Sequence, residues 1–456
     1  ANNDDAYVVD TIPIPERNPY GASTRLAGLD FFSDPTRAAV CTWKGDVWIV
    51  SGIDEKLDKV RWRRYASGLF DALGLKIVDD VVYVHGRDQI TRLHDLNGDG
   101  EADHYECFNN DVTITKNFHE FAFDLHTDRD GNFYFSKGGP VRPGGRGFDK
   151  IVPHHGCVLR VSKDGSKLDV YATGLRAPNG IGVSPDGQVT TGDNEGSWVP
   201  RCRLSWCRPG SFEGVVDTSQ QTPKPKDYNR PLCWFPKSVD NSSGGQVWVT
   251  SDRWGPLQGE LLHLSYGQTA LYRVLKESVG GQVQGGVVKF PMLFDSGVMR
   301  GRFNQGDGQL YLVGLRGWQS RASRGTCFQR VRYTGAPVRM PSGLRAKKGR
   351  LEIEFTTELD RRTAERASRY SIHMWNYLWT EDYGSPEVSV VHGPSRRMHD
   401  KVEIEAVTLS KDGRTVTLKM PGLRPCMQMK IAMNLRSSDG HPLRHEIYNT
   451  IHRLGE

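Results

Sequence analysis

Short apolar runs that break at Asp-Gly and related turns recur along the chain. The clearest example is the run 119–125, followed by the turn 128–131 and a second apolar run at 132–135. Apolar runs of this length predict strands, and Asp-Gly between two of them predicts a tight hairpin. The same strand–turn–strand pattern occurs at 43–48, 75–83, 180–189, 243–248 and 306–311.

The spacing of these hairpins predicts the fold class. Their turns lie near positions 45, 80, 131, 187, 245 and 308, at intervals of 35 to 63 residues. One hairpin repeated at this spacing is typical of a β-propeller, in which each repeat forms a blade. A β-sandwich with accidental Asp-Gly turns is the alternative, but sandwich turns recur every ~8–12 residues without a long period. We therefore predict an all-β chain with a six-bladed β-propeller.

Shifts in composition suggest the domain boundaries. Residues 1–20 are polar and contain several prolines, so we expect an N-terminal arm ahead of a propeller over 21–335. Pro337, Pro341 and Gly343 indicate a linker over 336–345. Alternating strands and another hairpin turn follow, which predicts a small C-terminal β-sandwich over 346–456. A chain of 456 residues is long enough for two domains.

Charge and cysteine content narrow the class of protein. The formal net charge of +6 favours an anionic partner, but no basic run or helix indicates nucleic-acid binding. No apolar stretch approaches the length of a membrane span. The first residue, Ala1, is compatible with removal of a signal peptide or with trimming. The eight cysteines include no Cys-x-x-Cys, so neither a zinc ribbon nor attached haem is indicated. Cys202 and Cys207 are the best candidates for a local disulfide. The alternative is that the cysteines are buried small side chains.

One acidic loop matches a calcium-binding pattern. Residues 95–106 fit D-x-[DN]-x-[DN]-G-x5-E, in which Gly100 allows the sharp turn. Calcium takes six to eight oxygen ligands, and this spacing brings carboxylates around one point. Strands flank the loop, so it differs from a helix-loop-helix site, and a solvated acidic turn is the alternative. The candidate calcium ligands are Asp95, Asn97, Asp99, Glu101, Asp103 and Glu106.

Propeller geometry indicates where the chemistry lies. Residues just before an innermost strand and just after the second strand of the same blade meet at one mouth of the propeller. His119 stands before a strand and is the best general base, because imidazole titrates near neutral pH. The arginines either bind carboxylates in bidentate fashion or pair with acids between blades. Other residues at these positions are Arg176, Asn179, Asp193, Glu195, Asp252, Arg253, Arg300 and Arg316. Trp254 and Trp318 lie nearby in the sequence and could stack on sugar rings. His155 is either a second pocket residue or part of a loop.

Several of these stretches resemble a known superfamily. His119 and the motifs 158–165, 174–187 and 192–196 follow the order found in the soluble quinoprotein glucose/sorbosone dehydrogenases. The stretches 240–246, 252–256 and 297–303 resemble a narrower branch, the secreted "membrane-bound dehydrogenase domain" proteins of Planctomycetes and Verrucomicrobia, without their haem domain. The resemblance implies a six-bladed propeller that uses pyrroloquinoline quinone (PQQ) and calcium, in the periplasm or outside the cell, with a redox partner such as a cytochrome.

The resemblance also implies roles for individual residues. His119 would take the proton of a sugar hydroxyl with Arg176 beside it. Arg300 and Arg316 would hold the quinone carboxylates, and 193–196 would lie near the catalytic calcium. Ala177, Arg300 and the stretch 195–197 depart from the family pattern.

Three functions therefore compete. The first is a quinone-dependent sugar dehydrogenase. The second is a cofactor-free polysaccharide lyase, with a hydrolase less favoured, in which an arginine neutralises a uronate and His119 or a tyrosine removes the α-proton. The third is a glycan-binding propeller without turnover. All three expect a sugar or anionic polysaccharide as the ligand.

Overall fold

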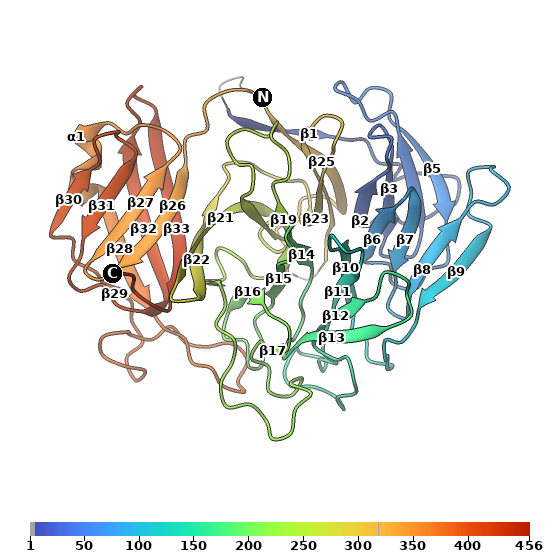
Figure 1. The fold of residues 1–456 in the computed structure, drawn as a ribbon, viewed down its shortest axis with the longest axis horizontal. Helices are drawn as coiled ribbons and strands as arrows, with labels where there is room; N and C mark the ends of the chain where they lie inside the picture. The colour runs from blue at the N-terminus through green and yellow to red at the C-terminus, as the bar shows by residue number, and fades with distance from the viewer. Residues whose placement is uncertain (1–4, 318) are drawn as a thin grey trace.

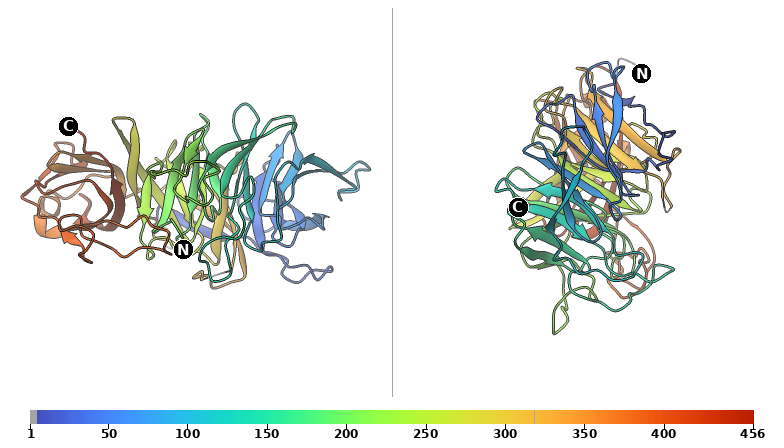
Figure 2. Two further views of the ribbon diagram at one scale, coloured as in Figure 1. Left: turned by 90° about the horizontal axis from the view of Figure 1, so that it is seen from below. Right: turned by 90° about the vertical axis from the view of Figure 1, so that its right-hand side faces the viewer.

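The computed structural model describes residues 5–317 and 319–456, and these residues form seven β-sheets with very little helix. Six of the sheets are the blades of a propeller, and the seventh belongs to a C-terminal sandwich (Figure 1). The prediction of an all-β six-bladed propeller followed by a sandwich is confirmed. Figure 2 shows the sandwich beside the propeller, at one end of the long axis of the molecule.

The first three blades follow one another along the chain. Each is an antiparallel meander, to which blade three adds a short parallel strand, β17. Their strands are β2 (Leu26–Phe31), β3 (Ala38–Thr42), β4 (Val47–Ser51) and β5 (Arg61–Ala66); β6 (Gly74–Val78), β7 (Val81–His85), β8 (Ile90–His94) and β9 (His104–Asn109); and β10 (Ala122–Thr127), β11 (Phe133–Lys137), β12 (Cys157–Val161), β13 (Leu168–Thr173) and β17 (Ser211–Phe212).

The last three blades complete the ring. Their strands are β14 (Ile181–Val183), β15 (Val189–Asp193), β16 (Cys202–Cys207) and β18 (Cys233–Phe235); β19 (Ser243–Trp248), β20 (Leu261–Ser265), β21 (Ala270–Val279) and β22 (Gln282–Lys289); and β23 (Gly297–Phe303), β24 (Leu310–Leu315), β25 (Thr326–Tyr333) and β1 (Tyr7–Thr11). The innermost strands contact one another in the closed order β2, β6, β10, β14, β19, β23 and back to β2.

Burial explains why the inner strands read as apolar runs. Every position of β3 is buried, because both of its faces pack against neighbouring blades, whereas β5 at the blade edge begins with alternating exposed and half-buried residues and is fully buried only at Ala66. Continuous apolar runs and alternating runs are the patterns expected for strands buried on two faces and on one face.

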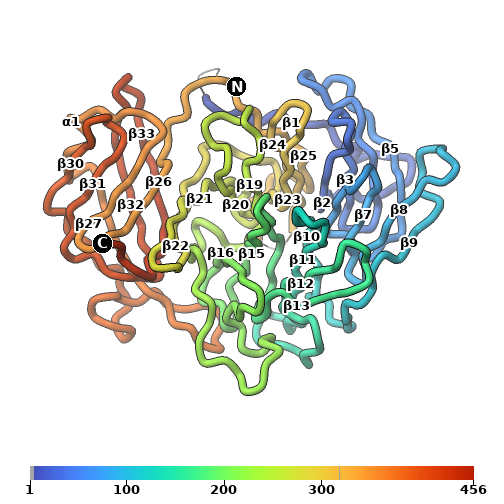
Figure 3. Tube along the Cα trace, viewed as in Figure 1, coloured from blue at the N-terminus to red at the C-terminus, as the bar shows by residue number. Residues whose placement is uncertain are grey.

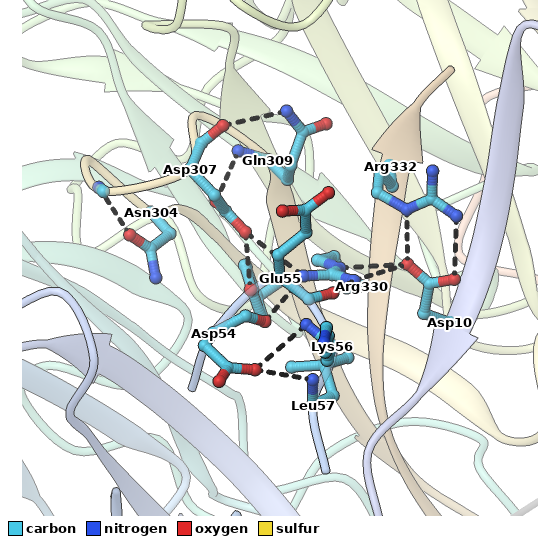
Figure 4. A network of polar contacts seen from close by, with 12 residues as sticks. Asp10, Asp54, Glu55, Lys56, Leu57, Asn304, Asp307, Gln309, Arg330 and Arg332 are labelled. Carbon is cyan, nitrogen blue, oxygen red and sulfur yellow. Dashed lines mark hydrogen bonds and ion pairs between the residues drawn. The ribbon is translucent and has the colours of Figure 1, made fainter. Parts of the chain in front are cut away.

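The N-terminal segment closes the ring, which differs from the arm expected over residues 1–20. Strand β1 pairs antiparallel with β25 and forms the outer edge of blade six. Asp10 accepts hydrogen bonds from Nε of Arg330 at 3.0 Å and from Nε of Arg332 at 2.9 Å, and Arg330 also binds the backbone of blade one at Asp54 and Glu55 (Figure 4). The run Tyr7–Val9 has the residue types of a strand, but the sequence gives no sign of its partner, which lies more than 300 residues away.

The C-terminal sandwich shares a sheet with the propeller. One of its layers joins blade five, because β33 pairs with β22 and the combined sheet has eight strands. The expected linker 336–345 already contains the start of β26, at Pro341. The sandwich strands are β26 (Pro341–Lys347), β27 (Arg350–Phe355), β31 (Thr415–Lys419) and β30 (Ala406–Leu409) in one layer and β33 (Pro442–Ile451), β32 (Cys426–Arg436), β28 (Tyr370–Trp375) and β29 (Asp400–Lys401) in the other, with α1 (Arg361–Ala364) and η1 (Ala367–Arg369) between β27 and β28.

Two further expectations concern a disulfide and membrane-spanning segments. All eight cysteines are free. Cys202 and Cys207 stand at opposite ends of β16, and five residues of extended strand span about 17 Å, so the expected disulfide between them does not form. No helix among the described residues is long and apolar enough to cross a membrane.

Candidate active site

A cavity of about 420 Å³ opens at the end of the propeller where the innermost strands begin. One part of its wall is apolar and aromatic, and the other part carries polar and charged side chains, which is the usual make-up of a small-molecule site. The apolar part includes Trp43, Leu73, Phe121, Phe123, Tyr266, Met299 and Leu315, and the polar part includes His119, Arg142, Arg176, Asn179, Asn194, Glu195, Asn241, Ser242 and Gln319.

His119 lies on the loop between β9 and β10, and its backbone is held from two sides. Its N–H donates to Oδ1 of Asn117 at 2.7 Å. Arg87 donates to the carbonyl oxygens of Asn117 at 2.9 Å and of Phe118 at 3.1 Å. The side chain of the next residue, Glu120, points away from the cavity into a fully buried cluster with Lys137 and His155. This anchoring fixes where the imidazole of His119 meets the cavity.

The imidazole of His119 is neutral at neutral pH. Burial, and then the positive charge of Arg176, lower its pKa from 6.5 to about 4. Hydrogen bonding between the ring and the backbone of Gly139 offsets part of this lowering of the pKa. A neutral imidazole can accept a proton, as a general base must.

Arg176 lies beside His119 on the loop before β14. Both its own N–H and that of Ala177 donate to the carboxylate of Asp193, at 2.8 and 2.7 Å, so the loop is clamped onto the end of β15. Its Nη2 atom donates to the carbonyl oxygen of Gly145 at 2.8 Å, while its buried Nε has no hydrogen-bond partner within the described part of the chain. Burial lowers the pKa of this guanidinium, which is still a cation at neutral pH.

Asn179 joins the cavity to a layer of charge beneath it. Its side chain lines the cavity and accepts a hydrogen bond at 3.1 Å from Arg300, which is itself fully buried. Arg300 also donates to the carbonyl oxygens of Leu73 and Met299 and lies 3.6 Å from the carboxylate of Asp124. Arg300 therefore lies under the floor of the cavity rather than in it, and its guanidinium already has partners.

The other residues expected to hold the quinone or its calcium either bind other groups of the protein or lie outside the cavity. The carboxylate of Asp193 caps backbone N–H groups, as described above. Glu195 lines the cavity, but its Oε1 lies 3.1 Å from Nζ of Lys237 and 3.5 Å from Nη1 of Arg201. Arg316 is exposed and does not line the cavity.

The expected sugar-binding residues lie away from the cavity. The hairpin of blade five is formed by β19 and β20, so 250–254 is the loop between them, at the opposite end of β19 from the cavity. Trp254 is fully buried there against Tyr7 and Phe290, and Arg253 donates to the backbone of residues 305 and 306. Asp252 is exposed, and His155 is buried in the cluster with Glu120. Trp318 lies outside the described residues.

The loop 95–106 is ordered by its own backbone. Asp95 accepts hydrogen bonds from Gly98 and Gly100, and Asp103 accepts from Leu96 and Asn97. Asp99 caps Glu101, whereas Glu106 pairs with Arg92 and His94 instead of turning into the loop. The described residues contain no group of three or more His, Cys, Asp or Glu placed to hold a metal ion. Calcium binding by this loop stays a prediction.

Two parts of the cavity wall escaped the sequence reasoning. One is the glycine-rich loop after β11, which contributes Arg142, Gly144 and Gly145. Its glycine content is the sequence feature that could have indicated this part of the wall. Tyr383 comes from the C-terminal sandwich, and nothing in its local sequence indicates that it reaches the propeller mouth.

Comparison with known proteins supports the fold. No family model matches the sequence. No curated protein matches it. Among solved structures, a putative oxidoreductase (glucose dehydrogenase) from Thermus thermophilus aligns with a TM-score of 0.54 and 16% identity, over 71% of this chain and 99% of that one. A glucose dehydrogenase gives 0.52 and 16%, over 71% and 98%. The holo PQQ domain of pyranose dehydrogenase from Coprinopsis cinerea gives 0.50 and 10%, over 73% and 96%. At these identities the likeness shows a shared propeller fold.

Proposed function

We propose that the chain is a carbohydrate-active enzyme that acts on an anionic sugar without a cofactor, by β-elimination. One observation carries the proposal: His119, a neutral imidazole, and Arg176, a guanidinium, lie side by side in the wall of the same cavity.

The charges of the two residues suit a uronate. The guanidinium of Arg176 pairs with the carboxylate of the sugar, as arginine does at carboxylate sites. This anion offsets the positive charge that lowers the pKa of His119, so binding raises that pKa toward the working range of a general base. The base is therefore strengthened only when the substrate is in place.

The reaction that follows is a balanced elimination. Neutral His119 takes the proton from C5, the carbon next to the carboxylate. The electron pair of that C–H bond forms the C4=C5 double bond, and the bond between C4 and the glycosidic oxygen breaks. The leaving sugar oxygen takes a proton from water, which gives a new hydroxyl end and an unsaturated uronate, and protonated His119 then returns its proton to the solvent. The aromatic wall, with Phe121, Phe123 and Tyr266, offers flat surfaces for sugar rings.

Quinone-dependent sugar oxidation is the second candidate. The observation that favours it is the fold shared with the glucose dehydrogenases and with the PQQ domain of pyranose dehydrogenase. The residues that the resemblance assigned to the quinone do not fit it, since Arg300 is buried with partners and Arg316 lies outside the cavity. We therefore derive no step through the quinone. In both candidates we place the protein in the periplasm or outside the cell, where polysaccharides are met, and only the second would need a redox partner such as a cytochrome.

The test is a screen of anionic polysaccharides, in which the ultraviolet absorbance of the new double bond reports the unsaturated product. We expect activity with at least one uronate polymer and loss of at least 100-fold in His119→Ala and Arg176→Ala, since a positioned acid–base group typically contributes about 10²–10⁴-fold. The control is Arg316→Ala, an exposed arginine outside the cavity, which should keep full activity. If no polymer gives unsaturated product and PQQ with calcium raises the thermal midpoint, oxidation replaces elimination.

A further inference from the structure

A segment of the C-terminal sandwich extends to the propeller mouth. Residues 376–399 join β28 to β29, leave the sandwich and run to blade four (Figure 3). Backbone hydrogen bonds fix the contact, because Trp198 N donates to Thr380 O at 3.0 Å and Gly384 N donates to Gly196 O at 3.2 Å. The segment therefore pairs, through its backbone, with the loop of blade four that carries Glu195.

Side chains reinforce this docking. The indole N–H of Trp379 donates to the carbonyl oxygen of Gly214 at 2.9 Å, and its ring lies 5.3 Å from that of Trp198 and 4.8 Å from that of Tyr228. Gly384 has a φ of +71°, and a side chain there would run into the carboxylate of Glu195. The path of the segment past the cavity is thus defined by close contacts on both sides of position 383.

Tyr383 is the residue that this docking brings into the cavity wall. The guanidinium carbon of Arg176 lies 5.4 Å from the centre of its ring. The ring remains 43% exposed, and its hydroxyl makes no hydrogen bond to the residues that the structure describes. Half-exposed aromatic rings with a free polar end are common where a ligand binds.

We infer that Tyr383 is a specificity-determining substrate contact, and that the C-terminal sandwich is therefore part of the active site. The inference rests on the proposed function and deepens it. The sugar whose carboxylate pairs with Arg176 lies along the ring of Tyr383 and receives a hydrogen bond from its hydroxyl. Because this ring is at the open side of the cavity, the site has room for the sugar next in the chain, so the substrate class is a uronate-containing oligosaccharide.

The test measures binding without turnover, in the whole chain of 456 residues with His119→Ala. Tetrasaccharides of galacturonate, alginate and hyaluronan are titrated by calorimetry, with neutral maltotetraose as the ligand control. Tyr383→Ala should weaken binding of the recognised tetrasaccharide by at least tenfold, and Tyr383→Phe by less. Val391→Ala is the matched control, because Val391 is an exposed residue of the same segment that does not line the cavity.

The outcomes separate this inference from the proposed reaction. If a tetrasaccharide binds and Tyr383→Ala weakens it, the inference holds even if the wild-type protein yields no unsaturated product. Equal affinity in Tyr383→Ala and Val391→Ala would overturn it, as would the absence of binding by all three uronate tetrasaccharides. Loss of affinity in Val391→Ala as well would show that any change in the segment acts through folding, which also removes the specific role of Tyr383.

Discussion

Gly196 lies so close to the guanidinium of Arg176 that a methyl group on Gly196 would overlap Nε and Cζ of the arginine. The backbone of Gly196 does not have a positive φ, so space rather than backbone conformation requires a glycine there. The unpartnered Nε of Arg176 is thus packed against the backbone of the loop that docks the C-terminal segment.

Gly196→Ala should move Arg176 and weaken ligand binding. The added methyl group has no room unless the guanidinium shifts, and the shift removes the charge from its place beside His119. We expect at least a tenfold loss of affinity for a uronate tetrasaccharide, measured by calorimetry. Gly325→Ala is the matched control, because Gly325 has no positive φ and no atom within reach of an added methyl group. Unchanged affinity in Gly196→Ala would show that the position of Arg176 does not matter for binding.

Arg176→Gln should raise the pKa of His119. Burial is the larger cause of its low pKa of about 4, and the positive charge of Arg176 is the next. Loss of that charge should therefore move the pKa part of the way up toward 6.5 and shift the acid limb of any activity profile to higher pH. The measurement is an NMR titration of the imidazole in the ligand-free protein, with Arg316→Gln as the control. A pKa that stays near 4 would mean that burial alone sets it.

His85 should make the protein less stable in mild acid. Its ring is fully buried 3.9 Å from that of Phe135, and burial, then Lys137, lower its pKa from 6.5 to about 3. Between about pH 3 and pH 6.5 only the unfolded chain takes up a proton on this imidazole. His85 therefore lowers the free energy of unfolding as the pH falls below 6.5. At about pH 5, roughly 1.5 units below 6.5, the effect is about 2 kcal/mol.

His85→Phe should remove this loss. The variant should lose about 2 kcal/mol less than the wild type between about pH 7.5 and pH 5 in urea unfolding. A difference between two pH values cancels any constant packing effect of the new ring. The exposed His104, changed to Gln, should follow the wild-type pH dependence. An identical slope in His85→Phe would show that His85 takes up a proton in the folded state.

Glu120→Gln should destabilise the loop that carries His119. The carboxylate lies 3.4 Å from Nζ of Lys137, and both side chains are completely buried. Without that charge the ammonium of Lys137 has lost its ionic partner, and breaking such a pair costs about 3–5 kcal/mol. The free energy of unfolding in urea tests this. Glu405→Gln, in a surface pair with Lys419, should cost less than about 1 kcal/mol. Similar losses for the two variants would contradict the expectation.

Asp10→Asn should loosen the closure of the ring. It weakens the hydrogen bonds from Arg330 and Arg332 that hold β1 on blade six, and hydrogen bonds to charged groups contribute about 1.5–3 kcal/mol each. We expect faster amide hydrogen exchange in β1 and a lower urea midpoint. Asp58→Asn, at an exposed position of blade one, is the control. If exchange in β1 does not change, the backbone ladder with β25 holds the strand without these ion pairs.

The hydrophobic pattern determined the blades. Four of the six predicted turns, near 80, 131, 187 and 308, join the first two strands of a blade, because the apolar runs and the turn there lie within about a dozen residues. The turn near 45 instead joins β3 to β4, and the predicted hairpin at 243–248 is wrong, because these residues form the single strand β19. The same locality placed His119, Arg176 and Asn179 at the cavity, because each precedes an innermost strand and propeller geometry brings those positions to one mouth.

Tertiary structure decided what depends on distant partners. Arg300 also stands on an innermost strand, yet its side chain turns under the cavity because Asp124 and the carbonyl oxygens of blades two and six receive it there. Trp254 is buried by Tyr7, from the other end of the propeller sequence. Tyr383 reaches the cavity only because its segment docks on blade four. Each outcome is set by packing between segments far apart in the chain, and a local pattern carries no information about which segment its side chains will meet.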